Sequence, residues 1–409
     1  MQIIAPRATP HKPVPRGVAR SGPPLFSYGF RPFFLGAGLH ALLAMGLWIG
    51  ALAGAWSVGG SAGPIAWHGH EMLFGYGAAA LAGFVLTAVP NWTGRLPVSG
   101  PPLMVLVALW LAGRLAGLAP QLLGELASAA LDCLFLPALA FVVGREVVSG
   151  RNWKNLRVAG AISGLAVLNL GYHLAQAMGG DPYLVLRLTV ALFVTLVGLI
   201  GGRIIPSFTR NYLSKRGAAR LPASVGRFDQ LAVALALLAG AGWALWPDVL
   251  ASTGLAAAAA LLHAIRLARW QGQATWREPL LLMLHLSYAF VPAGFAMLAL
   301  AGLGLVAPAS ALHVLTVGAI GLTTFAVMAR ASRGHTGRPL TASTTTTVAY
   351  GCLLLAAVMR PLAEALPMAY HLVLLASGLL WLAAFGLFVA EHAGMLLTPS
   401  LRQPARSLS

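Results

Sequence analysis

Long apolar stretches with few charges between them constrain this chain more than any other feature of its sequence. Of its 409 residues, 58% are hydrophobic and only 9% are charged, and the mean hydropathy is +0.79. Soluble globular domains usually carry about 25% charged residues. Because so few charges cannot cover the surface of a soluble body of this size, lipid must be the solvent for most of the exterior.

Twelve of these stretches have the length of a membrane-spanning helix, and most can cross a hydrocarbon core of roughly 30 Å at about 1.5 Å per residue. We therefore predict an all-α polytopic membrane helix bundle of about twelve transmembrane helices at residues 33–392, between a flexible basic tail at 1–32 and a C-terminal tail at 393–409. The expected spans are 34–56, 71–91, 102–118, 122–144, 157–179, 183–205, 229–246, 249–269, 279–303, 309–331, 342–363 and 367–390.

The distribution of Lys and Arg sets the expected orientation. With the N-terminal tail in the cytoplasm, 24 of the 27 Lys and Arg residues fall in cytoplasmic segments, and only Arg114, Arg187 and Arg360 lie toward the other side. Since cytoplasmic loops are enriched in Lys and Arg, both termini are predicted to be cytoplasmic. The net charge of +17 is scattered over many loops, which predicts contact with membrane lipids and argues against a nucleic-acid partner.

Eleven histidines are the most informative residues in so apolar a chain. Imidazole is costly in hydrocarbon unless it has a partner, so intramembrane histidines are functional candidates. Four imidazoles at one depth are enough for a haem or copper site, although a hydrogen-bonded core histidine is an equal alternative at two of the positions, His173 and His313. The four that fall near the outer ends of three predicted helices are His68, His70, His173 and His313.

Two of these histidines stand close together in the segment Trp-His-Gly-His-Glu-Met at 67–72. Residues two apart on a regular helix point about 200° away from each other. His68 and His70 can therefore share one metal only if the backbone at Gly69 is not helical. Otherwise they serve two different centres, or one of them faces lipid headgroups. Glu71 is available as an acceptor for an imidazole N–H group.

Other polar residues within the predicted spans extend the candidate site. Arg114 and Arg187 lie toward the outer side, where a haem propionate would neutralise them, and contact with lipid phosphate is the alternative. Asp132, at mid-depth in the fourth span, could relay protons or form a hydrogen bond to a neighbouring helix. A second site on the inner side could use His263, His285 or His335.

Several short motifs occur in order from residue 30 to about residue 340, and together they resemble the NnrS family of bacterial membrane proteins. The combination is more specific than any one of its parts. The motifs are Phe-Arg-Pro-Phe-Phe at 30–34, the 67–72 segment, Thr-Ala-Val-Pro-Asn-Trp-Thr-Gly at 87–94, Leu-Ala-Gly-Arg at 111–114, Gly-Arg-Ile-Ile-Pro at 202–206, His-Val-Leu-Thr-Val-Gly-Ala-Ile-Gly at 313–321 and Gly-His-Thr-Gly-Arg-Pro at 334–339.

This resemblance implies a multi-pass protein of the bacterial inner membrane that contains haem b and copper and is associated with denitrification and with tolerance of nitric oxide. On the same basis His68, His70, His313 and His335 occupy family motif positions, and His173 and His285 occupy similar contexts. His40 and His371 match none of these motifs and are left out of the expected site.

We therefore expect a haem iron and a copper ion near the outer face, held by His68, His70, His173 and His313. Such a site could reduce nitric oxide to N2O, as a nitric oxide reductase-type oxidoreductase. The hypothesis assigns proton transfer to Glu71 and Asp132, with Glu125 as another donor at the outer side. The electron donor would be quinol or a periplasmic carrier.

Three alternatives to turnover remain open at this stage. A nitric oxide sink or sensor would use the same site without an electron supply. A transporter or metal-handling permease would use the same polar residues as a substrate path, and broken helices would favour it. A structural or regulatory partner of respiratory enzymes would contain no cofactor.

Overall fold

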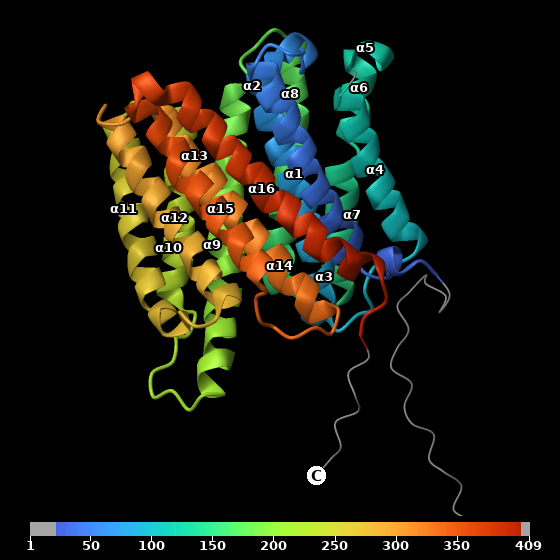
Figure 1. Ribbon diagram of the computed structural model, residues 1–409, viewed down its shortest axis with the longest axis vertical. Helices are drawn as coiled ribbons and strands as arrows, with labels where there is room; N and C mark the ends of the chain where they lie inside the picture. The colour runs from blue at the N-terminus through green and yellow to red at the C-terminus, as the bar shows by residue number, and fades with distance from the viewer. Residues whose placement is uncertain (1–21, 119, 402–409) are drawn as a thin grey trace, which may run out of the picture.

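The computed structural model describes residues 22–118 and 120–401, which form an all-helical bundle (Figure 1). In these residues, 12 helical segments are long and apolar enough to cross a membrane, which confirms the predicted fold class. Both ends of the described chain lie at the same end of the bundle, as an even number of spans requires (Figure 1).

Most spans are built on one continuous helix. These helices are α1 (Phe30–Leu52), α4 (Pro101–Leu118), α8 (Leu156–Ala177), α9 (Tyr183–Ser214), α10 (Arg227–Leu245), α11 (Leu250–Ala268), α12 (Pro279–Gly302), α15 (Thr344–Leu362) and α16 (Tyr370–Leu397). Short helices between or beside them are η1 (Pro24–Ser27), η2 (Gly60–Ala62), α5 (Pro120–Leu123), η4 (Trp153–Asn155), η5 (Gly272–Thr275), η7 (Ala363–Ala365) and η8 (Pro367–Ala369).

Three spans are divided. The fourth span contains α6 (Glu125–Asp132) and α7 (Phe135–Ser149), which are separated by a turn. The second contains α2 (Gly63–His70), the π-helical segment η3 (Glu71–Gly77) and α3 (Ala78–Thr93). The tenth contains α13 (Pro308–His313), the π-helical segment η6 (Val314–Leu322) and α14 (Thr323–His335).

Both π-helical segments directly follow a histidine, namely His70 in the second span and His313 in the tenth. A π-helical turn contains an extra residue and changes the direction of side chains on either side of it, and such turns are frequent at functional sites. The irregularity therefore coincides with two of the histidines that the sequence had singled out.

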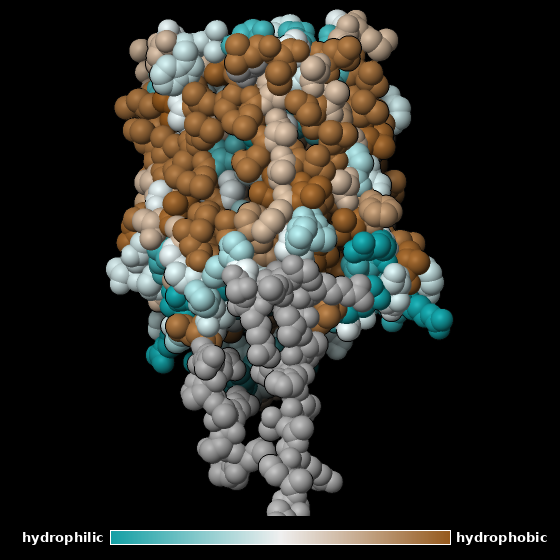
Figure 2. Space-filling model, turned by 90° about the vertical axis from the view of Figure 1, so that its right-hand side faces the viewer, coloured by the Kyte–Doolittle hydropathy of each residue, from teal (hydrophilic) through white to brown (hydrophobic). Residues whose placement is uncertain are grey.

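The second, sixth and tenth spans form the centre of the bundle. In their most apolar windows 83%, 61% and 67% of the residues are buried, compared with 33–56% in the other spans. Helix α9 contacts both η3 and η6, and α3 contacts α14, so the three spans pack against one another. The other spans present their hydrophobic side chains outward, and Figure 2 shows such side chains over most of the visible face, with hydrophilic residues gathered toward its lower end.

The second span begins earlier than the predicted start at residue 71. Helix α2 starts at Gly63 and has a proline at its first turn, a position that favours proline because the missing N–H would have no partner in the helix. His68 and His70 are therefore inside a helix instead of at its entrance. The backbone at Gly69 is helical.

The sixth span is longer than the predicted 183–205, since α9 continues to Ser214. Hydropathy falls at Arg203, but hydropathy marks the limit of the apolar region and not the end of the helix. Pro206 lies inside α9 and Pro292 inside α12, so neither ends its helix. Proline is tolerated within membrane helices when neighbouring groups satisfy the freed carbonyls.

The segments predicted as tails lie mainly outside the described residues, but Arg31 does not behave as part of a flexible arm. Its side chain is buried in α1 and donates hydrogen bonds to the carbonyl oxygens of Leu396 (2.9 Å) and Thr398 (2.6 Å). A further bond reaches Ser400 Oγ at 2.9 Å. Arg31 thus ties the first span to the end of the last one.

A fully buried ion pair joins three helices of the second half. Arg266 Nε in α11 lies 2.8 Å from Asp229 Oδ1 in α10, and Arg266 Nη1 donates to the Tyr288 hydroxyl in α12 at 2.8 Å. The same nitrogen donates to the carbonyl oxygen of Gly198 in α9. A hydrogen bond joins His263 to the Tyr288 hydroxyl and completes the network.

This network predicts that a variant that breaks the ion pair is much less stable than one in which both partners are replaced by apolar residues. Asp229→Asn leaves the Arg266 charge uncompensated and should lower the free energy of unfolding by roughly 3–5 kcal/mol. The double variant Asp229→Leu/Arg266→Met should recover most of that loss. Thermal unfolding of the detergent-solubilised protein measures both, and a double variant less stable than the single one would contradict the assignment.

The charge distribution also predicts an orientation that can be measured. Alkaline phosphatase, which is active only outside the cytoplasm, should be inactive when fused after Leu401 and active when inserted in the loop between Ala177 and Tyr183. A green fluorescent protein fusion at Leu401 should be fluorescent. The reverse pattern would show that the termini are on the outer side.

Candidate metal centre

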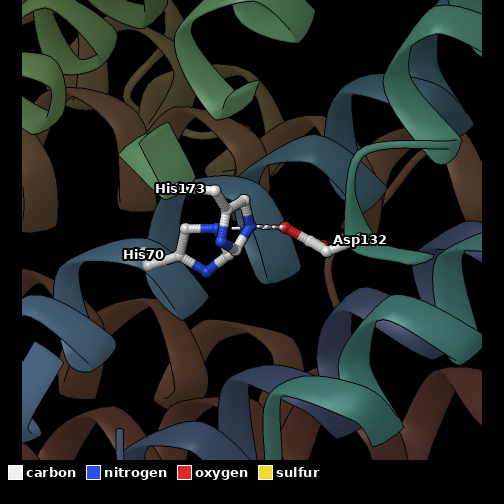
Figure 3. Close-up of side chains that lie close together, drawn as sticks. All are labelled: His70, Asp132 and His173. Atoms are coloured by element: carbon white, nitrogen blue, oxygen red, sulfur yellow. Dashed lines mark hydrogen bonds and ion pairs between the residues drawn. The ribbon is translucent and has the colours of Figure 1, made fainter. Parts of the chain in front are cut away.

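Three side chains from three helices converge near one end of the bundle: the buried His70 of α2 and Asp132 of α6, and the partly buried His173 of α8 (Figure 3). Asp132 Oδ2 lies 3.2 Å from His70 Nε2 and 2.8 Å from His173 Nε2. One ligand atom from each residue lies within 4.8 Å of the others. We refer to these residues as the His–Asp–His group.

The interruption of the fourth span positions Asp132. Asp132 is the last residue of α6, before the turn that leads into α7. A Cβ atom on Gly113 of α4 would lie 2.8 Å from Asp132 Oδ1 and 2.9 Å from its Cα. Only glycine at this position lets α4 pass so close to α6, which is the close backbone approach by which membrane helices associate.

Arg114 supplies the counter-charge to the group. Its Nη1 lies 2.7 Å from Glu71 Oε1, and its Nη2 contacts Asp132 Oδ1. All three side chains are almost completely buried. Because a buried carboxylate is very costly without a partner, one guanidinium that bridges two carboxylates makes this cluster possible within the membrane.

Glu71 and Asn169 orient the imidazole of His70. Glu71 Oε1 lies 3.1 Å from Nδ1, and Asn169 Oδ1 lies 2.9 Å from Nε2. The ring also stacks on Tyr172, with the ring centroids 4.4 Å apart. A carboxylate behind one ring nitrogen fixes the tautomer of a metal-binding histidine and leaves the other nitrogen for the metal.

His40 of α1 extends this arrangement away from the group. Its Nε2 lies 2.9 Å from Glu71 Oε2, and both side chains are buried. A Cβ atom on Gly75 would overlap the His40 ring, so the glycine in η3 provides the space for this contact. Glu71 therefore lies between two imidazoles and one guanidinium.

The donor atoms of the His–Asp–His group fit a transition-metal ion. Asp132 Oδ2 lies 3.2 Å from His70 Nε2 and 2.8 Å from His173 Nε2, so one ligand atom from each residue could bind the same ion. Metal–ligand bonds of about 2.0–2.1 Å place tetrahedral ligand atoms ~3.3 Å apart, close to the spacing observed. Two imidazoles and one carboxylate suit zinc, non-haem iron and copper(II).

The same surroundings do not fit a haem. A cavity of about 70 Å³ adjoins the group, whereas pockets for drug-sized ligands measure roughly 300–1,000 Å³. Both terminal nitrogens of Arg114 already contact carboxylates, so this residue is engaged where a propionate partner was expected. The cavity has the size for an ion with water molecules or for a diatomic gas.

The structure separates the other two outer histidines from the group. His68 points to the opposite face of α2 from His70, as a helical Gly69 requires, and its ring stacks on Trp48 at a centroid distance of 4.5 Å. His313 Nδ1 faces the carbonyl oxygen of Ala309 at 2.7 Å. His68 Nδ1 is buried and has no hydrogen-bond partner among the described residues.

The remaining candidates lie apart from one another. His285 Nε2 lies 2.8 Å from Thr209 Oγ1, whereas His335 packs on the ring of Phe30. His263 belongs to the Arg266 network described above. Arg187 has a buried Nε without a hydrogen-bond partner in the described part of the chain.

Sequence reasoning missed two members of this cluster, His40, which matches no motif, and Asn169, for which no partner is expected. Asp132 is expected to relay protons or to form a hydrogen bond to a neighbouring helix, but not to bind a metal. Asn169 and His173 are four residues apart on α8 and so share one face of that helix. This spacing is the sequence feature that could have revealed Asn169.

The bridging role of Arg114 predicts that lysine cannot replace it. A single ammonium cannot reach both Glu71 and Asp132 in the way the two guanidinium nitrogens do, so Arg114→Lys should cost on the order of 3 kcal/mol of stability. Arg187→Lys is the matched control and should cost under about 0.5 kcal/mol. Thermal unfolding measures both, and equal losses would contradict the bridge.

No curated protein gives a match to the chain. The family model described as NnrS protein matches residues 24–400, which is most of the chain. This protein belongs to the NnrS family.

Proposed function

We propose that the protein binds a copper ion at His70, Asp132 and His173 and reduces nitric oxide to N2O at that centre, relieving nitrosative stress. The observation that carries the proposal is the buried His–Asp–His group, in which two imidazole nitrogens lie 2.8 and 3.2 Å from one carboxylate oxygen. Copper and nitric oxide come from what the NnrS resemblance implies. Imidazole and carboxylate ligands are compatible with copper(II).

The overall reaction sets what the site must supply. Two molecules of nitric oxide, two electrons and two protons give one N2O and one water, so one N–N bond forms and one N–O bond breaks. When bound, copper supplies an open coordination position and one-electron redox chemistry. The two electrons would come from quinol or from a carrier at the outer side.

The chain's own residues bind the ion, orient its ligands and deliver protons. His70, Asp132 and His173 bind the ion, and Glu71 holds the His70 ring through Nδ1. Because Asp132 serves as a ligand in this proposal, we assign proton delivery to Glu71. Its second oxygen lies 2.9 Å from His40 Nε2 and is thus free of the His70 contact.

The size and chemistry of the cavity select a small substrate. Its volume of about 70 Å³ accommodates a diatomic molecule, and buried aromatic residues, Trp67 and Tyr172, form part of its wall. Nitric oxide is neutral and dissolves in lipid, so it can reach such a site from within the bilayer. A sink or sensor would use the same contacts and differ only in receiving no electrons.

One observation favours a second candidate, a metal-handling permease. The fourth span is interrupted at Asp132, in the middle of the cluster of polar residues. Transporters often place their binding sites at discontinuous membrane helices. In this alternative the group would bind the metal ion as cargo, and nitric oxide would not be consumed.

Metal analysis of the purified protein tests the proposed centre. We expect about one copper per chain, near-complete loss of copper in His70→Ala and His173→Ala, and full copper content in the control His371→Ala, whose side chain is exposed. Glu71→Gln should weaken copper binding by about 10–100-fold, because it removes the partner that orients His70. Full copper content in both ligand variants would contradict the site.

Gas analysis then separates turnover from the alternatives. The copper-loaded protein with a reductant should convert nitric oxide to N2O, and His173→Ala should not. Binding of nitric oxide without N2O would favour the sink or sensor, and copper transport into sealed vesicles would favour the permease. The haem expected from the resemblance stays a prediction, and a Soret band in the visible spectrum would establish it.

A further inference from the structure

The cavity beside the His–Asp–His group runs between the buried site and the surface. Its walls come from α2, α4, α6, α8 and the segment around η2. The inner end is formed by the group and Glu71, whereas the outer end includes two exposed residues, Ser61 and Glu125. It therefore reaches the end of the bundle opposite to that where the described chain begins and ends (Figure 1).

Two buried polar atoms in its wall have no hydrogen-bond partner among the described residues: Trp67 Nε1 and Ser128 Oγ. Trp67 and Ser128 are only 4% and 6% exposed. Since buried polar groups are almost always hydrogen-bonded, two such atoms around one cavity indicate that water is their partner. A water molecule needs about 10–15 Å³ of such space, so about 70 Å³ holds several.

The charge of the wall selects for cations. Three of the chain's ten carboxylate residues, Glu71, Glu125 and Asp132, line the cavity. Arg114, which bonds two of them, contributes the compensating positive charge within the cluster. The wall therefore keeps a net negative charge, and low-dielectric walls of one charge sign concentrate ions of the opposite sign.

Glu125 occupies the outermost position of this series. It is the first residue of α6, it is exposed, and its Oε1 accepts a hydrogen bond from the Ser61 N–H at 3.2 Å. This bond holds the η2 segment beside α6 at the entrance to the cavity. A cation from the aqueous phase meets the Glu125 carboxylate before it meets Asp132.

We infer that this cavity is a hydrated, cation-selective inlet through which a metal ion reaches His70, Asp132 and His173 from the aqueous phase at that end of the bundle. The claim that the inlet carries a metal ion rests on the proposed function. The water-filled, cation-selective path does not, because it follows from the unpartnered polar atoms and the carboxylates alone.

Thiol labelling tests the path without a metal. Ser128→Cys is introduced into a chain in which Cys133 and Cys352 are replaced by serine, and sealed vesicles of either orientation are treated with methanethiosulfonate ethylammonium or with the anionic ethylsulfonate reagent. We expect labelling in one orientation only, with the cation reacting about tenfold faster or more. Adding Glu125→Gln should reduce this preference to roughly threefold or less.

Two control positions sharpen this experiment. Val167→Cys replaces a 69% exposed residue in the middle of α8, and Ser287→Cys replaces a fully buried residue of α12. Neither should react with these water-soluble reagents at the rate of Ser128→Cys. An unreactive Ser128→Cys, or one that reacts faster with the anion, would overturn the inlet.

Copper loading tests the cargo. Copper added to metal-depleted protein should protect Ser128→Cys from labelling, and Glu125→Gln should slow copper uptake about tenfold at low salt without changing the final copper content. Asp181→Asn, an exposed carboxylate in the loop after α8, is the control and should load at the normal rate. Normal labelling with no copper uptake would refute the proposed function and leave the inlet standing, whereas normal copper uptake in Glu125→Gln would refute the role of Glu125.

Discussion

The structure depends on the neutralisation of charge inside a body whose solvent is lipid. Arg114 contacts Glu71 and Asp132, and these three side chains hold the first, second, third, fourth and fifth spans around one polar point through His40, His70 and His173. Each charge would be prohibitively costly alone in this environment. Because the partners come from separate helices, the energetic need for pairing also fixes the arrangement of those helices. The Asp229–Arg266 network has the same effect in the second half of the chain.

Irregular helices are what bring the polar side chains together. A π-helical segment begins directly after His70, the fourth span turns directly after Asp132, and glycine at position 113 lets α4 pass against α6. A regular helix offers one face at a fixed repeat, so it cannot easily direct several adjacent residues to one point. Two of the three divided spans, the second and the fourth, are irregular at the candidate centre, and irregular turns are frequent at functional sites. The π-helical segment of the tenth span follows His313 and lies apart from the group.

The bundle could be predicted from the sequence because its cause is local: hydropathy and Lys/Arg placement depend on each stretch separately. The site could be predicted only in part. The depth of His70 and His173 followed from the spans, and the separation of His68 from His70 followed from helical geometry once Gly69 was known to be helical. The pairing of Arg114 with Glu71 and Asp132, and the place of His40 and Asn169, depend on how distant helices pack. Sequence spacing within one helix carries no information on that packing.

Charge is divided unequally between the two ends of the bundle, and this division bears on how the centre is supplied. Most Lys and Arg residues lie in the segments predicted to face the cytoplasm, whereas three carboxylates line the cavity that opens at the other end. A metal ion that approached from the basic end would meet repulsion and then the tightly packed second, sixth and tenth spans. An ion from the opposite side meets Glu125, water-sized space and then the imidazoles of the His–Asp–His group. The same asymmetry that predicts the orientation of the chain therefore also favours supply of the metal from the end of the bundle opposite to the termini.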